Sequence, residues 1–304
     1  MDGSRRTSGL MGRRTGAGFN STKWQFPILL AGRLRQEDAL QNFDPYVLVK
    51  RAACYLVRHG PVTKQERWED SSGYSPSTLA ACIAALICAG CFCRKRGDTA
   101  TAQFLAEYAD FLESHIERWM ATTEGSLLPS VRRHWIRLLP ADPDDPSPNE
   151  NPNTAAATIP NQPPGEVLRL PAKEIVDAGF LELVRYGVRS PDDPLIIDSL
   201  RVVDALLKVE TSNGPCWRRY NHDGYGQRED GGPFVGWGQG RAWPLLTGER
   251  RTTNLPRGAT SAGSFWRWNG SQRARACLPN RFGTSRTGAR CICISAGPPP
   301  RPCR

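Results

Sequence analysis

The sequence predicts an all-α domain in which helices form hairpins and long irregular loops join them. Two observations support this class. In several segments longer than ten residues, apolar side chains recur at spacings of three and four, which is the period of an amphipathic helix. The connecting stretches are rich in Pro, Gly, Asn and aromatic residues, and outside these loops the sequence shows little β propensity. Paired helices around a shared core satisfy this pattern, and function is expected in the loops at one end of the array.

Four helices are predicted in the first part of the chain. Residues 26–40 begin as an apolar stripe and turn polar, as a helix does when it leaves a core. The segment 44–60 opens with Asp-Pro, an N-cap followed by proline at the first helical position, and ends at Gly-Pro. Ser-Pro opens another helix over 75–92, and the apolar spacing over 100–120 indicates the fourth.

Two long loops and three further helices are predicted beyond these. A Pro-, Asn- and Asp-rich stretch over 140–166 leaves no room for regular structure, and so long a loop within a domain is usually functional or a linker. Apolar periodicity then predicts helices over 172–186 and 195–209. An aromatic and polar loop over 213–233 follows, and a short helix is expected within 240–250.

The net charge of +10 is concentrated at the two ends of the chain. Residues 251–304 contain ten Arg and four Cys but no Lys, Asp or Glu, whereas residues 26–250 are mildly acidic. A basic segment with Arg but no Lys is typical of a GC-rich gene read out of frame. Basic arms that bind nucleic acid usually also contain Lys, so this composition favours a frameshift over such an arm. We therefore expect a disordered or out-of-frame arm over 1–25, a structured domain over 26–250 and a frameshifted, disordered tail over 251–304. A nucleic-acid-binding tail is the alternative.

An uncharged stretch over 71–93 raises the question of a membrane span. Its strictly apolar part is shorter than the ~20 residues that a bilayer requires, so we expect a buried core helix and no membrane partner. Cys88, Cys91 and Cys93 end this helix without a nearby His, which favours small residues at a tight helix contact over a zinc site. Since no secretory signal is recognisable, the cytoplasm is the default location, and localisation stays open.

The stretch over 65–80 carries the strongest chemical signal. Glu69 and Asp70 are adjacent carboxylates in a turn directly before a helix start, with Arg and Trp beside them. Trp stacks on the apolar face of a pyranose, and Arg and Asp bind its hydroxyl groups, so this mixture suits sugar chemistry. On its own the turn would be interpreted as solvated, but the loop over 213–233 has a similar composition and favours a functional role.

Four spaced motifs resemble glycoside hydrolase family 15, the family of the bacterial glucoamylases. They are WED with GYSPSTLA (68–80), RYNHDGYG (219–226), EDGGPF (229–234) and GRAWPLLTGER (240–250), and the likeness runs in order over about 26–250. The resemblance implies a partial (α/α) toroid of paired helices, of the six-hairpin glycosidase type, with the active site at one end. It also implies exo-acting, inverting hydrolysis of terminal α-linked glucose in maltooligosaccharides or other starch-like α-glucans, without a cofactor or a metal.

The resemblance also assigns roles to individual residues. Glu69 matches the family's general acid, which protonates the glycosidic oxygen. Trp68 matches the aromatic residue of its sugar site, and Arg219 with Tyr220 matches its substrate-binding RY motif. Asp70 stands where the family usually has a second Glu, so its shorter side chain changes that contact with substrate. For two further residues of the RY motif, substrate contact and a purely local turn role are equal alternatives: His222 and Asp223.

A general base is not found in the sequence. Inversion requires a second carboxylate across the sugar, which the family supplies from a Pro-Glu motif after its TGER segment, and no Pro-Glu pair occurs here. We therefore expect an acid without its base, and a chain with negligible activity. A carbohydrate-binding remnant without turnover is the alternative, and the linkage, whether of starch, dextran or trehalose, stays open.

Overall fold

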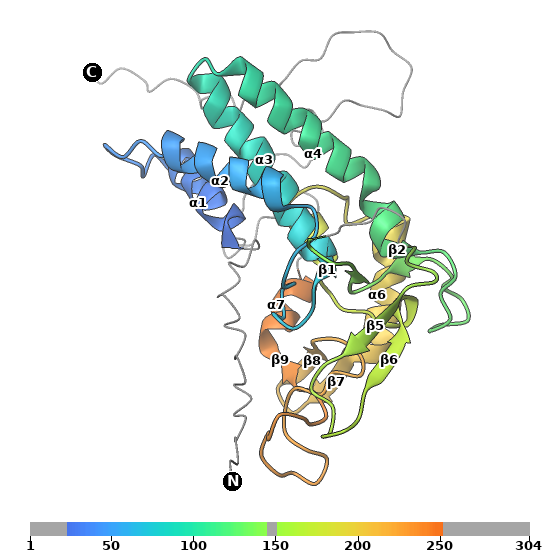
Figure 1. Cartoon of the computed structure of the whole chain (residues 1–304). Helices are drawn as coiled ribbons and strands as arrows, with labels where there is room; N and C mark the ends of the chain where they lie inside the picture. The colour runs from blue at the N-terminus through green and yellow to red at the C-terminus, as the bar shows by residue number, and fades with distance from the viewer. Residues whose placement is uncertain (1–22, 145–150, 252–304) are drawn as a thin grey trace, which may run out of the picture.

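The computed structural model describes residues 23–144 and 151–251, and helices form most of their regular structure (Figure 1). The helices are α1 (Gln25–Gln36), α2 (Tyr46–His59), α3 (Pro76–Lys95), α4 (Thr99–Met120), η2 (Ala172–Glu174), α5 (Leu181–Arg185), α6 (Pro194–Leu207) and α7 (Pro244–Arg251). The four helices predicted before residue 121 are confirmed. The helices predicted over 195–209 and within 240–250 are also confirmed, as α6 and α7. The expected end segments over 1–25 and 251–304 lie outside the described residues, apart from 23–25 and 251.

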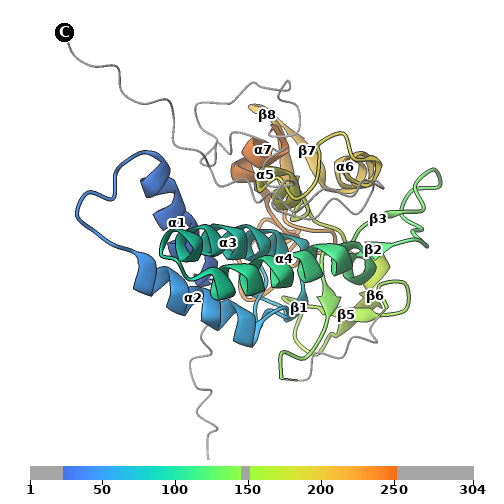
Figure 2. The same cartoon turned by 90° about the horizontal axis from the view of Figure 1, so that it is seen from above.

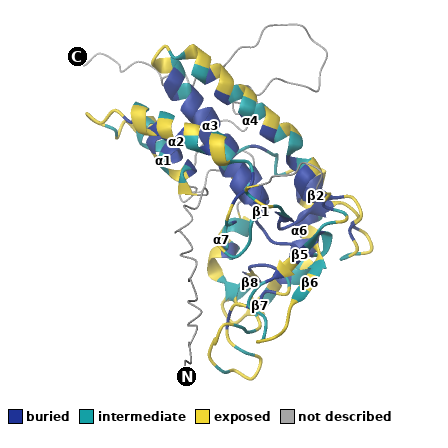
Figure 3. Cartoon of the chain, viewed as in Figure 1, coloured by how far each residue is buried: buried dark blue, intermediate teal, exposed yellow. Residues whose placement is uncertain are grey.

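Helix α3 is the centre of the core. It packs against α1, α2, α4 and α5, and Figure 2 shows α3 and α4 running side by side. Leu79, Ile83 and Leu86 are completely buried, and α3 is mostly dark blue in Figure 3. By length and mean hydropathy of 1.9 this helix could cross a membrane, but 83% of its apolar window is buried inside the protein. It is therefore the buried core helix that the sequence predicts.

Small residues bring α1 and α3 close together. A Cβ atom on Gly32 would lie 2.5 Å from the Sγ atom of Cys88, and that thiol donates a 3.6 Å hydrogen bond to the carbonyl oxygen of Ile28. Cys88 is buried in this contact. Of the two interpretations of the cysteine cluster, the structure supports the tight helix contact. Within residues 23–144 and 151–251, no group of three or more His, Cys, Asp or Glu side chains is arranged to hold a metal ion.

Short antiparallel strands occupy the loops at one end of the helices (Figure 1). They pair as β1 with β4, β2 with β3, and β5 with β6, while β8 lies between β7 and β9 and pairs with both. Their bounds are β1 (Gly73–Tyr74), β2 (Ala121–Thr122), β3 (His134–Trp135), β4 (Leu139–Pro140), β5 (Ala156–Ile159), β6 (Leu168–Pro171), β7 (Lys208–Thr211), β8 (Gly214–Arg218) and β9 (Ala242–Trp243). These strands hold together the segments that form the candidate site.

Three sequence predictions about these loops are wrong. The stretch over 140–166 contains β5, and the loop over 213–233 contains the whole of β8, because pairing with β6 and β7 satisfies their backbone groups. The helix predicted over 172–186 is only η2 and α5. Between η2 and α5 the backbone forms hydrogen bonds to another segment and not within a helix: the Ile175 carbonyl accepts a 2.8 Å hydrogen bond from the Arg137 amide. Tertiary contacts therefore override the apolar periodicity of this segment.

The backbone at position 73 requires glycine, and an alanine substitution there tests this requirement through the free energy of unfolding. Its φ is +150°, and an added Cβ would lie 2.1 Å from the carbonyl oxygen of Leu139 in the paired strand. Gly97 has φ +76° with nothing within 4 Å of an added Cβ, so it is a matched control. We expect Gly97→Ala to cost about 1 kcal/mol of unfolding free energy, the usual cost of a left-handed residue. Gly73→Ala should cost at least twice as much in urea denaturation, and equal losses would contradict this account.

Candidate active site

The WED loop, defined here as residues 65–71, is closed by Glu66. The Glu66 amide donates to the carbonyl oxygen of Ser71, and the Glu66 carbonyl accepts from the Glu69 amide, both at 2.9 Å. The Glu66 side chain folds back, so that Oε2 accepts a 3.0 Å hydrogen bond from the Trp68 amide. Glu69 adopts a left-handed conformation with φ +60°. One buried acidic residue thus fixes the turn that presents Trp68, Glu69 and Asp70.

Arg137 joins this loop to the RYNHD turn, defined as residues 219–223. Its side chain is 2% exposed, and Nη2 donates to Glu66 Oε1 at 2.9 Å and also to Asp70 Oδ1. The guanidinium lies 3.7 Å from the ring centroid of Tyr220. The Tyr220 hydroxyl in turn donates a 2.9 Å hydrogen bond to Asp70 Oδ2. Both oxygens of Asp70 therefore accept hydrogen bonds, Oδ1 from the guanidinium of Arg137 and Oδ2 from the phenol of Tyr220.

Burial sets the charge state of this cluster. Removal from water raises the pKa of Glu66 to about 8; Arg137 opposes the shift, and Asp70 adds to it. Burial disfavours the charge of Arg137, but its carboxylate neighbours, Glu66 first, raise its pKa further, so it stays a cation. Burial likewise raises the pKa of Tyr220, which keeps its phenolic proton available for donation. The cluster therefore contains a permanent cation, Arg137, and a buried carboxyl group, Glu66, that holds its proton to a higher pH than usual.

The RYNHD turn presents Arg219 toward the same place. Arg219 Nε and Nη2 donate to the two oxygens of Asp223 at 2.7 and 2.6 Å, and both side chains are buried. This fork geometry fixes the plane of the guanidinium. Arg219 Nη2 lies 3.8 Å from Asp70 Oδ2, and its guanidinium carbon is 4.7 Å from the ring centroid of Tyr225. His222 has φ +63°, the left-handed geometry of a turn.

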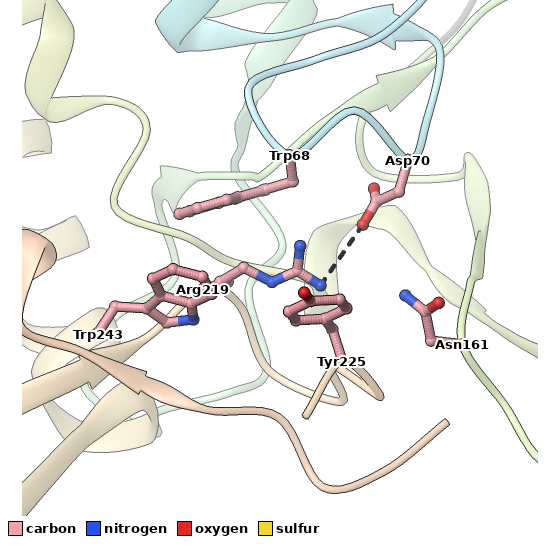
Figure 4. Close-up of a pocket in the computed structure, with 6 residues that line it drawn as sticks. All are labelled: Trp68, Asp70, Asn161, Arg219, Tyr225 and Trp243. Atoms are coloured by element: carbon pink, nitrogen blue, oxygen red, sulfur yellow. Dashed lines mark ion pairs between the residues drawn. The ribbon is translucent and has the colours of Figure 1, made fainter. Parts of the chain in front are cut away.

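These segments surround a pocket of about 360 Å³ (Figure 4). Its lining residues are Trp68, Asp70, Asn161, Arg219, Tyr225 and Trp243. The structure therefore brings together Trp68, Asp70 and Arg219 of the predicted set, while Tyr220 and Asp223 lie beneath them as their hydrogen-bond partners. The other three lining residues were not predicted. Tyr225 and Trp243 lie within the motifs RYNHDGYG and GRAWPLLTGER, so motif membership could have indicated them. Asn161 lies in the Pro-rich loop over 140–166, outside the four motifs.

Glu69 and His222 do not line this pocket. The Glu69 side chain is 59% exposed, and its carboxylate lies 3.6 Å from the ammonium group of Lys23. In the chain it stands between two lining residues, Trp68 and Asp70. Glu66, by contrast, is 1% exposed, and both its oxygens accept hydrogen bonds from the protein. Of the two glutamates in the loop, only Glu69 can meet a ligand.

The raised pKa of Glu66 predicts a dependence of stability on pH. A carboxyl group with a pKa near 8 when folded and 4.5 when unfolded binds its proton more tightly in the folded state. Its stabilising contribution is therefore full below pH 4.5 and is lost as pH rises towards 8, by up to about 1.4 kcal/mol per pH unit. We expect Glu66→Gln to flatten this decline in urea denaturation between pH 5 and 8. The exposed Glu210→Gln is the control, and a decline that Glu66→Gln leaves unchanged would contradict the assignment.

Comparison with known proteins places the chain in a family. Residues 24–269 match the family described as Glycosyl hydrolases family 15. The chain is 45% identical, over 224 residues, to a glucoamylase of Clostridium sp. (strain G0005); the matched part is 74% of this chain and 29% of that protein. The chain thus spans under a third of the length of this relative.

A solved structure gives the same result. The crystal structure of a bacterial glucoamylase complexed with acarbose superposes with a TM-score of 0.64 and 41% sequence identity. The match covers 77% of this chain and 32% of that one. The predicted fold class, an all-α partial (α/α) toroid with long irregular loops, is therefore confirmed. Because the family match extends over most of the chain, this protein belongs to the glycosyl hydrolases of family 15.

Proposed function

We propose that the pocket binds the terminal glucose unit of a starch-like α-linked oligosaccharide, and that the WED loop carries the acid of an exo-acting, inverting glycosidase. The observation that carries this proposal is the lining of the pocket. Three aromatic rings stand with one arginine, one aspartate and one asparagine around a space of about 360 Å³. Sugar sites combine such features, because the rings cover apolar faces and the polar groups bind hydroxyls. The glucoamylase relatives, one of them in complex with acarbose, support the same substrate class.

The roles of the lining residues follow from their surroundings. Trp68 supplies the ring that stacks on the glucose unit, and Arg219 supplies donors in a plane fixed by Asp223. Asp70 accepts from sugar hydroxyls with oxygens already oriented by Arg137 and Tyr220. Tyr220 and Asp223 thus act through the residues they hold. His222 has a local turn role in this proposal, because it does not line the pocket.

Glu69 is the proposed proton donor. In the inverting reaction it would protonate the glycosidic oxygen as the bond to the anomeric carbon breaks, while water attacks that carbon from the opposite face. A second carboxylate, roughly 6.5 to 9.5 Å from the acid, must take the proton of that water. The sequence contains no Pro-Glu pair, the motif that resembles the family's base. We therefore propose that the 304-residue chain alone binds the sugar without turning it over.

Binding can be tested by calorimetric titration of the purified chain with maltotriose. We expect saturable binding that Trp68→Ala and Arg219→Met each weaken by about tenfold or more, as for buried aromatic and arginine contacts elsewhere. Arg218→Met is the matched control, because its exposed side chain is adjacent in sequence and does not line the pocket. If the wild-type chain does not bind maltotriose, or if Arg218→Met weakens binding as much as Arg219→Met, the proposed sugar site is wrong.

Turnover is a separate test of the acid and base assignment. We expect the wild-type chain to release no glucose from maltotriose above background, and Glu69→Gln to leave the affinity unchanged within about threefold. The measurement is a coupled glucose assay on the protein used for titration. Glucose release that Glu69→Gln abolishes would refute the absence of turnover while supporting Glu69 as the acid. Glucose release that persists in Glu69→Gln would refute both the absence of turnover and the role of Glu69 as the acid.

A further inference from the structure

The indole of Trp68 is held by a residue that the sequence analysis did not single out. Trp68 Nε1 donates a 3.1 Å hydrogen bond to Asp177 Oδ2. The other oxygen, Oδ1, accepts a 2.8 Å hydrogen bond from the Gly179 amide. Asp177 is 3% exposed, and both its oxygens are therefore committed to fixed donors. A buried carboxylate with two such bonds has little freedom to rotate, and the indole bound to it shares that restriction.

The backbone around Asp177 is itself fixed to the RYNHD turn. Asp177 forms an antiparallel bridge with Tyr220. The side chain of Asn221 accepts a 2.8 Å hydrogen bond from the Val176 amide and donates one of 2.6 Å to the Glu174 carbonyl. Asp177 thus stands on a third loop, the one between η2 and α5, which is clamped beside the pocket. Its position relative to Trp68 does not depend on the WED loop alone.

Cations also act on Asp177, and the charges of Arg67 and Arg137 both favour its ionised form. The WED loop carries a cation, Arg67, whose guanidinium lies 4.6 Å from the ring centroid of Trp68. Arg67 Nη2 already donates to both oxygens of Glu249, at 2.7 and 2.9 Å. Burial raises the pKa of Asp177, and the charge of Arg67 works against that rise. The hydrogen bond to the indole is therefore a specific contact, in addition to any general neutralisation of Arg67.

We propose that Asp177 is a positioning residue that fixes the plane of the Trp68 indole at the wall of the pocket. Its consequence for sugar binding rests on the proposed function. A ring stacks well on a pyranose only when its face is parallel to the sugar, and rotation about the side-chain torsions would remove that contact. Rotation would also break the 3.1 Å hydrogen bond and leave an oxygen of the buried Asp177 without its donor, which disfavours other orientations.

A double-mutant cycle separates positioning from general stability. Leucine has a shape close to that of aspartate but accepts no hydrogen bond, and Trp68→Phe removes the indole donor while keeping a ring. We expect Asp177→Leu to weaken maltotriose binding about tenfold or more when Trp68 is present, as for loss of a charged hydrogen bond. In the Trp68→Phe background the same change should weaken binding less than about threefold. An equal factor in both backgrounds would overturn the proposal.

A second measurement needs neither sugar nor the Asp177 variant. In a ¹⁵N-labelled sample the indole signal of Trp68 is the one that disappears in Trp68→Phe. We expect its proton to exchange with solvent at least a hundredfold more slowly than that of free tryptophan, because it is hydrogen-bonded to Asp177, a carboxylate that is itself buried. Exchange as fast as in free tryptophan would overturn the positioning role. If the wild-type chain fails to bind maltotriose, the proposed function falls, and this signal still decides the role of Asp177.

Discussion

The buried guanidinium of Arg137 is the interaction on which the candidate site depends. Its side chain donates to Glu66 and Asp70 of the WED loop and lies over the ring of Tyr220 in the RYNHD turn. Its amide donates to the carbonyl oxygen of Ile175, at the start of the loop that carries Asp177. One residue thus contacts three segments that are far apart in the sequence. Removing one partner of such a buried ion pair typically costs about 3–5 kcal/mol, because the remaining charge is left uncompensated.

The site therefore has two levels with different physical tasks. Aromatic rings and polar side chains line the pocket, and a side chain on a loop needs neighbouring contacts to fix its rotamer. Beneath them a buried set of partners does so: Asp223 fixes Arg219, Tyr220 and Arg137 fix Asp70, and Asp177 with Glu66 fixes Trp68. The helical core around α3 supports this arrangement from one end (Figures 1 and 3). Loops that are irregular in backbone geometry are in this way made rigid by buried hydrogen bonds.

The parts of this site that could be predicted are those with a local signal. Motif spacing identified Trp68, Asp70 and Arg219, and helix starts such as Ser75-Pro76 located the core helices to within a few residues. The roles of Arg137 and Asp177 could not be assigned, because they arise from partners at long sequence separation. A charged residue inside the apolar run HWIRLLP was a usable hint, since a buried arginine requires a partner. The helix predicted over 172–186 failed for a related reason, because Ile175, Val176 and Phe180 are buried from the loop between η2 and α5.

The most direct test of this account is hydrogen exchange, followed by mass spectrometry, in Arg137→Met. The exposed Arg133→Met, four residues away in the same segment, is the control. If Arg137 holds the loops together, amides of the WED loop and of the RYNHD turn will lose protection together in Arg137→Met, while the α3–α4 hairpin keeps its protection. Unchanged protection in both loops, or a loss confined to one of them, would contradict the central role of this buried cation.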